Sequence, residues 1–159
     1  MTITAGMAIP SVDIHTKTAE GLDTVNTADY CAGRKVVLFA VPGAFTPTCS
    51  AKHMPGFVKK FDQLKAKGVD AVVCLAVNDA HAMLAWAKAQ GAEGKIDMFA
   101  DPRCDVSKAL GIDRDMGSVM GIRAARCAFI IDDGVISNVF MEEVGVFDVS
   151  SVENILAHL

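Results

Sequence analysis

The sequence predicts an α/β fold in which a central mixed sheet is flanked by helices. Three observations predict it: apolar runs of strand length, amphipathic stretches between them, and Asp132-Asp133-Gly134 between two late apolar runs. Strands that alternate with helices favour a parallel sheet covered by helices, whereas Asp-Gly between apolar runs is a strong hairpin signal. The sheet should therefore contain both parallel and antiparallel pairs.

The elements are expected in the following order along the chain. Strands are predicted at residues 36–41, 69–77, 96–100, 126–131 and 135–141. Helices are predicted at residues 49–67, 79–91 and 106–110, and from Ser150 or Ser151 to the C-terminus.

Local signals support the ends of these elements. Pro55 predicts a kink in the first helix, and Gly68 is the expected residue just after its C-terminus. Asp79 has the position and chemistry of an N-cap for the second helix. Residues 69–77 are nearly all apolar, as expected of a central strand that is covered on both faces.

Composition bounds the possible classes of protein. With 159 residues, 52% hydrophobic and 21% charged, the chain is expected to form a single domain over residues 1–159. A net charge of −4 and the absence of a basic stripe argue against a nucleic-acid partner. No apolar run approaches the roughly 18 residues that span a membrane, and the first ten residues do not resemble a secretory signal. The expected location is cytoplasmic.

The cysteines point to thiol chemistry. Their number, five, is odd and they form no C-x-x-C pair, which argues against both a secreted disulfide scaffold and a structural zinc site. Cys49 is distinctive, because it follows an apolar strand and a turn that contains Pro42 and Pro47. It should lie at a helix start, where unpaired backbone N–H groups and the helix dipole favour a thiolate. Thr46, three residues earlier, can aim a hydroxyl at the group that the sulfur attacks.

These same residues carry a family resemblance. Pro42-x-x-x-Thr46-x-x-Cys49 resembles the active-site signature of the peroxiredoxins. The longer run Pro42-Gly-Ala-Phe-Thr-Pro-Thr-Cys-Ser-Ala-Lys-His-Met-Pro-Gly-Phe57 resembles the type II, peroxiredoxin-5-like branch. The similarity continues through Cys74-Leu-Ala-Val-Asn78-Asp79, Trp86, Ala100-Asp101-Pro102 and Gly121-Ile-Arg-Ala-Ala-Arg126.

The resemblance implies a thioredoxin-like fold and a thiol peroxidase that needs no metal or bound cofactor. Cys49 would be the nucleophile, Thr46 would hydrogen-bond the peroxide, and Pro42 would keep water from the sulfur. The family's arginine precedes the strand that enters the hairpin, so this role is assigned to Arg126, with Arg123 as the alternative. Hydrogen peroxide and small organic hydroperoxides would be reduced through a sulfenic acid on Cys49.

His53 raises two further hypotheses. Four residues after Cys49, it could share a helix face with the sulfur and act as the base of a cysteine hydrolase, or both could bind a metal. No motif supplies the remaining residues of either site. A structural surface histidine is the preferred interpretation.

The remaining cysteines and the C-terminus decide how the enzyme would be regenerated. Some relatives carry a resolving cysteine where this chain has Val149. A one-cysteine mechanism is therefore expected, with reduction by glutathione and glutaredoxin or by thioredoxin. Cys74 is interpreted as an inert buried thiol and Cys31 as peripheral, and the thiols most able to pair with Cys49 are Cys104 and Cys127.

Two expectations complete this interpretation. The resemblance implies a homodimer built near the active-site loops, with Phe45 and Pro47 as candidate contacts. The competing functional class is a thiol-switch redox sensor that uses Cys49 without efficient turnover.

Overall fold

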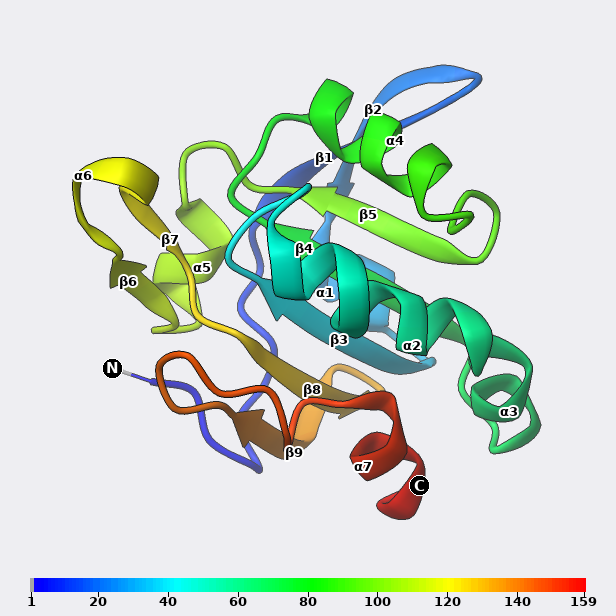
Figure 1. Ribbon diagram of the computed structural model, residues 1–159. Helices are drawn as coiled ribbons and strands as arrows, with labels where there is room; N and C mark the ends of the chain where they lie inside the picture. Colours follow the sequence, from blue (N-terminus) through cyan, green and yellow to red (C-terminus); the bar gives the residue numbers. More distant parts are fainter. Residues whose placement is uncertain (1) are drawn as a thin grey trace.

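A seven-stranded sheet forms the centre of the molecule (Figure 1), and the computed structural model describes residues 2–159 around it. The strands of this sheet are β1 (Asp13–Thr18), β2 (Gly21–Asn26), β3 (Lys35–Val41), β4 (Ala71–Ala76), β5 (Ile96–Ala100), β8 (Cys127–Asp132) and β9 (Val135–Met141). Their order in space is β2-β1-β5-β4-β3-β8-β9. β3 is parallel to β4 and antiparallel to β8, so the predicted mixed α/β sheet is confirmed.

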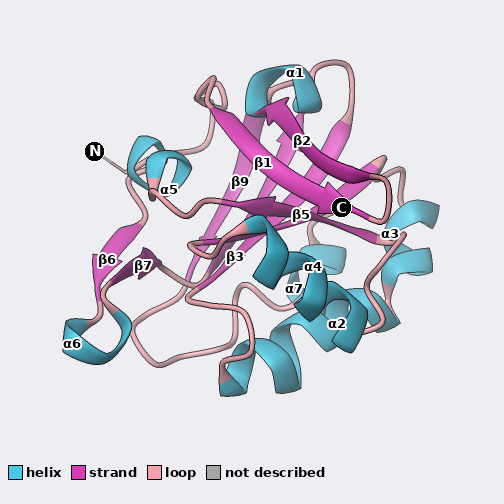
Figure 2. Ribbon diagram, turned by 90° about the horizontal axis from the view of Figure 1, so that it is seen from above, coloured by secondary structure: helices cyan, strands magenta, loops and turns pink. Residues whose placement is uncertain are grey.

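Helices cover both faces of the sheet. They are α1 (Thr27–Cys31), α2 (Met54–Lys59), α3 (Phe61–Ala66), α4 (Ala80–Ala89), α5 (Asp105–Ala109), α6 (Gly117–Met120) and α7 (Val152–Ala157), with a π-helical turn, η1 (Cys49–His53), before α2. α2, α3, α4 and α7 lie along one face of the sheet (Figure 2). Their buried side chains form one apolar layer with the sheet. The second layer, on the other face, includes Cys31 of α1 and Val106 of α5. This arrangement is the thioredoxin-like fold.

β3 lies at the centre of the sheet because its sequence is apolar on both sides. Val36 through Val41 are buried, and alternate residues contribute to opposite layers: Val37 and Phe39 to one, Val36 and Leu38 to the other. The loop that leads to Cys49 therefore begins from a strand that is buried on both faces and paired on both edges.

The local signals are present where the sequence places them. Gly68 follows the last turn of α3 with φ of +90°. The Asp79 carboxylate caps α4 by accepting the N–H of Ala82 at 2.9 Å. Asp133 and Gly134, with φ of +48° and +77°, make the tight turn between β8 and β9, and Ser151 caps α7.

The first helix differs from the single element that was predicted. It begins at Pro47, contains the π-helical turn η1 in place of a regular α-turn, and breaks at Lys60, whose φ and ψ of −104° and 17° separate α2 from α3. Pro55, the expected kink, sits in the first turn of α2, where its missing N–H is tolerated best.

Two parts of the fold were not predicted. The β1–β2 hairpin with α1 is largely polar, so its strands carry little hydrophobic signal, and of β1 only Ile14 is fully buried. The second part is a small sheet of β6 (Asp113–Asp115) and β7 (Ile122–Ala124), with α6 between its strands. Its elements have three or four residues each, too short for a periodic pattern.

Within residues 2–159, no helix is both long and apolar enough to cross a membrane.

Candidate active site

Cys49 is held in the first helical turn after β3. Beyond Val41 the chain turns through Pro42 and Gly43 and enters the helix at Pro47. The N–H of Ala44 donates to Oδ1 of Asn78 at 2.9 Å, so the loop after β4 supports this turn. Cys49 is 0% exposed, which places its sulfur in a low-dielectric environment at the end of the helix where backbone N–H groups lack intrahelical partners.

A π-helical turn positions the sulfur relative to the rest of the helix. The N–H of Met54 bonds to the carbonyl of Cys49, five residues earlier, and Pro55, which has no N–H, follows directly. Single π-turns inside α-helices are frequent at functional sites, because they rotate a side chain out of the regular helical register.

Arg126 lies directly against the sulfur. It precedes β8, and its Nη2 donates to Sγ of Cys49 at 3.0 Å. Its Nη1 lies 2.8 Å from Nδ1 of His53. A guanidinium is permanently charged and planar, so it stabilises a thiolate and can also reach an oxygen bound beside it.

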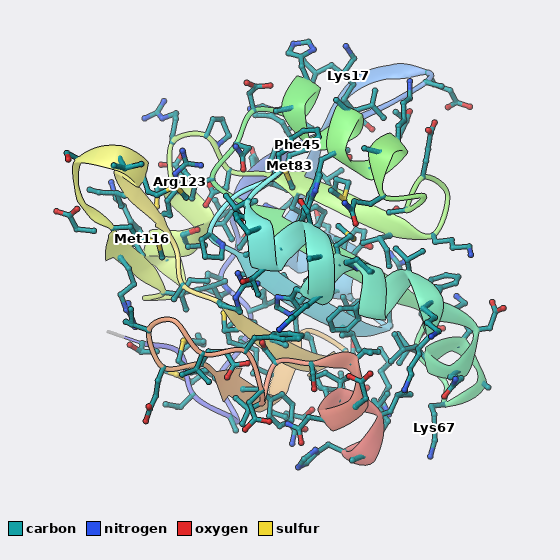
Figure 3. The ribbon with its side chains drawn as sticks, in the orientation of Figure 1. Lys17, Phe45, Lys67, Met83, Met116 and Arg123 are labelled. Carbon is teal, nitrogen blue, oxygen red and sulfur yellow. The ribbon has the colours of Figure 1, made fainter. Side chains whose placement is uncertain are left out.

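Arg123, the alternative from the sequence, is occupied elsewhere. It lies on β7 (Figure 3), where its Nη1 donates to the carbonyl of Val77 at 2.9 Å and its Nε to that of Met120 at 2.7 Å. A Cβ at Gly43 would lie 3.3 Å from Nη1 of Arg123. Arg123 therefore braces the active-site loop and the start of the loop after β4, whereas Arg126 contacts the sulfur.

Thr46 and Pro42 lie on the turn before Cys49. The hydroxyl of Thr46 donates to the carbonyl of Gly43 at 2.7 Å, which leaves its oxygen lone pairs available as an acceptor. Pro42 and Arg126 line a pocket of about 580 Å³, with Phe147 in another wall. A small molecule in this pocket would lie next to the guanidinium and close to the buried sulfur.

His53 is a core residue, and the predicted surface histidine is wrong. It is 1% exposed and packs between Phe39, Phe57 and Phe147, with ring centroids 5.0 to 5.7 Å apart. Burial, with Arg126 as the second cause, lowers the pKa of His53 to about 3. The position of His53, four residues after Cys49 and next to Met54 in the predicted helix, was the sequence signal that could have indicated its burial.

The hydrogen-bond partners of the neutral His53 ring select one tautomer. Because Arg126 donates to Nδ1, the proton lies on Nε2, which donates to the carbonyl of Ser150 at 3.0 Å. Both nitrogens are thus engaged away from the sulfur, and neither serves as the base that a cysteine hydrolase needs. No group of three or more His, Cys, Asp or Glu residues in the chain from residue 2 onward is placed to hold a metal ion.

The five cysteines are all free and buried. Cys74 belongs to the same apolar layer as Cys49, whereas Cys31 and Cys127 belong to the layer on the other face. Burial raises the thiol pKa of Cys127 to about 12 and that of Cys74 well above its ordinary value. Cys127, one of the two thiols expected to be most able to pair with Cys49, is buried in the central sheet on the face opposite Cys49.

Comparisons with known proteins agree with this geometry. The Redoxin family model matches residues 4–156. Peroxiredoxin-2E-2, chloroplastic, of Oryza sativa subsp. japonica is 44% identical over 99% of this chain and 73% of its own length. Peroxiredoxin-2B of Arabidopsis thaliana is 42% identical over 87% of this chain and 86% of its own. The crystal structure of reduced Prx3 from Vibrio vulnificus in complex with H2O2 superposes with a TM-score of 0.96, at 45% identity over 99% of both chains. The chain therefore belongs to the Redoxin family as a peroxiredoxin of the type II branch, a thiol peroxidase.

Proposed function

We propose that the chain reduces hydrogen peroxide and small organic hydroperoxides by attack of the Cys49 thiolate on the terminal peroxide oxygen. A sulfur–oxygen bond forms, the O–O bond breaks, and the hydroxyl is transferred to sulfur as a sulfenic acid. The departing alkoxide or hydroxide takes a proton from water, which yields an alcohol or water.

The observation that carries this proposal is the 3.0 Å contact between Nη2 of Arg126 and Sγ of Cys49. The guanidinium holds the thiolate before the reaction and stabilises charge on the departing oxygen as the O–O bond breaks. Thr46 contributes an acceptor for the peroxide O–H, because its own proton is already directed at Gly43. Pro42, in the wall of the pocket, limits the access of water to the sulfur.

The mechanism we favour uses one cysteine and an external reductant. Val149 occupies the position where some relatives carry a resolving cysteine, and the other four thiols are buried. Glutathione with glutaredoxin, or thioredoxin, would attack the Cys49 sulfenic acid from the pocket. The redox-sensor alternative is not favoured, because the curated relatives are named as peroxiredoxins.

The test compares two cysteine substitutions. Cys49→Ser should abolish peroxide consumption in a steady-state assay with a reducing system, because it removes the nucleophile. Cys74→Ser is the matched control and should retain most of the activity, since Cys74 is buried in β4. Turnover that persists in Cys49→Ser would refute the proposal.

A homodimer is the assembly that we propose. Large apolar side chains are exposed near the active-site loop: Phe45 at 58%, Val119 at 92% and Ile122 at 50%. Phe45 lies on the loop before η1, and Met120 of α6 lies close to Gly43 of that loop, so the two exposed regions adjoin. Sedimentation of the reduced protein at micromolar concentration should give a dimer, and Phe45→Ser should weaken it. A monomer at that concentration would contradict this assembly.

A further inference from the structure

We propose that Glu142 is a positioning residue for the thiol peroxidase reaction, which acts on Arg126 through Ser150 and His53. The inference rests on the proposed function of Cys49 and Arg126. Glu142 directly follows β9, and its backbone N–H donates to the carbonyl of Arg126 at 3.1 Å. Within the described chain, its carboxylate makes no hydrogen bond to the sulfur or to the guanidinium.

Glu142 folds the segment between β9 and α7 into a tight turn. Its Oε2 accepts the N–H of Asp148 at 2.6 Å and both the N–H and the hydroxyl of Ser150, at 3.0 and 2.7 Å. Its Oε1 accepts the N–H of Val149 at 3.2 Å. Burial works against the charge of this carboxylate, but the bonds from Ser150, Asp148 and Val149 outweigh it and lower the pKa of Glu142. The turn is therefore organised around an ionised carboxylate.

The turn ends in a carbonyl that determines the state of His53. The carbonyl of Ser150 accepts Nε2–H of His53 at 3.0 Å. This bond keeps the proton on Nε2 and leaves Nδ1 as an acceptor, which receives Nη1 of Arg126 at 2.8 Å. The same guanidinium donates through Nη2 to Cys49 at 3.0 Å. A continuous chain of hydrogen bonds thus connects Glu142 with the nucleophile.

The turn also covers His53 and Arg126, the two residues that lie between Ser150 and Cys49 in this series of hydrogen bonds. Phe147 packs with its ring centroid 5.0 Å from that of His53, and the guanidinium carbon of Arg126 lies 6.0 Å from the Phe147 centroid. If the carboxylate no longer gathered the N–H groups of residues 148–150, both the Ser150 carbonyl and the Phe147 ring would lose their fixed positions. Arg126 would then keep its charge but lose its orientation, and orientation strongly affects reaction rate.

The first experiment uses Glu142→Gln. The glutamine amide replaces one carboxylate oxygen with an NH2 group. That group faces the N–H and hydroxyl groups of residues 148–150, which are also donors, so the turn should loosen. We expect the second-order rate constant for reaction with hydrogen peroxide to fall about tenfold, as for a loss of orientation at the reacting groups. Glu153→Gln, the same substitution on the exposed first turn of α7, should leave it unchanged. Ser150→Ala, which removes one side-chain hydrogen bond and keeps the carbonyl, gives a milder variant that should show a smaller loss.

A double-mutant cycle tests the route. His53→Asn keeps an acceptor near the position of Nδ1 but removes the donor to Ser150. If Glu142 acts through His53, then Glu142→Gln should add no further loss of rate in the His53→Asn background. If the double variant instead shows the product of the two single-variant reductions in rate constant, Glu142 acts by another route and the inference is overturned.

A spectroscopic measurement separates this inference from the proposed function. The nitrogen chemical shifts of the His53 ring should report a single tautomer with the proton on Nε2 in the native protein, and a mixture of tautomers in Glu142→Gln. This result does not require peroxidase activity, so it stands even if the role of Cys49 fails. An unchanged tautomer together with an unchanged rate constant in Glu142→Gln would refute the positioning role.

Discussion

Arg126 and Arg123 lie three residues apart and have the same charge, but their surroundings give them different tasks. Arg123 satisfies two backbone carbonyls, Val77 and Met120, with its Nη1 and Nε. Arg126 directs both of its terminal nitrogens toward side chains, Cys49 and His53. A sequence cannot show this difference, because both arginines precede short apolar segments, and only the family resemblance favoured Arg126.

The two arginines give a direct prediction at this scale. Arg126→Gln should lower the rate constant for peroxide on the order of 10²-fold, because it removes a preorganised charge at the reacting atoms. It should also change the rate of alkylation of Cys49 by iodoacetamide at neutral pH, because the guanidinium that donates to Sγ is removed. Arg123→Gln is the matched control and should have a smaller effect on both. Rapid-mixing kinetics measures the rates, and a larger effect of Arg123→Gln would exchange the two assignments.

His53 makes stability depend on pH. Its native pKa, about 3, lies below its ordinary value of 6.5, so the unfolded chain binds the proton more readily than the native protein. The contribution of neutral His53 to the free energy of unfolding is complete above about pH 6.5. It is lost as pH falls toward 3, by at most about 1.4 kcal/mol per pH unit. The free energy of unfolding in urea should therefore fall between about pH 7 and about pH 5, above the range in which most carboxylates titrate.

Two variants identify the source of this slope. His53→Asn removes the titrating ring and should flatten the dependence between neutral and mildly acidic pH. His81→Asn, at an exposed position on α4, should leave it as it is in the native protein. A slope that persists in His53→Asn would mean that another group is responsible.

At the scale of elements, the parts that the sequence predicted well are those with strong hydrophobic patterns. β3, β4 and β8 are apolar runs bounded by turn residues, and the Pro42 to Cys49 turn follows from prolines and a helix start. η1 has no pattern of its own, because a π-turn depends on one hydrogen bond shifted by a residue. The turn around Glu142 was missed for a similar reason: one carboxylate organises it, and acidic residues in a polar loop are usually solvated.

The active-site loop and the end of α3 provide contrasting glycine substitutions. A Cβ at Gly43 would lie 3.3 Å from both Nη1 of Arg123 and Cγ2 of Thr46, so Gly43→Ala should displace Thr46 and lower the peroxide rate constant by up to about tenfold. Its effect on stability should be small, because these side chains can shift. Gly68 has open space but φ of +90°, so Gly68→Ala should cost about 1 kcal/mol of stability without changing the rate. Thermal unfolding and peroxide kinetics of both variants test this contrast, and the opposite pattern would contradict it.

At the scale of the whole molecule, the central sheet divides the thiols into two groups. Cys49 and Cys74 belong to the layer with α2, α4 and α7, whereas Cys31 and Cys127 lie on the far side. Contact between Cys49 and a thiol of the far group would require the chain to open a sheet in which β3 pairs with β4 and β8 along its length. The fold itself therefore separates a sulfenic acid at Cys49 from Cys31 and Cys127.

This isolation predicts the products of oxidation. One equivalent of peroxide should give a sulfenic acid at Cys49, and glutathione should trap it as a mixed disulfide at the same residue. With Val149 rather than a cysteine at the resolving position, excess peroxide should convert Cys49 to the sulfinic acid, which is irreversible for most proteins. Intact mass and peptide mapping, with and without glutathione, distinguish these species, and Cys49→Ser is the control that should show none of them. A stoichiometric disulfide from Cys49 to Cys74, the thiol on the same side of the sheet, would replace the one-cysteine mechanism and leave the peroxidase assignment intact.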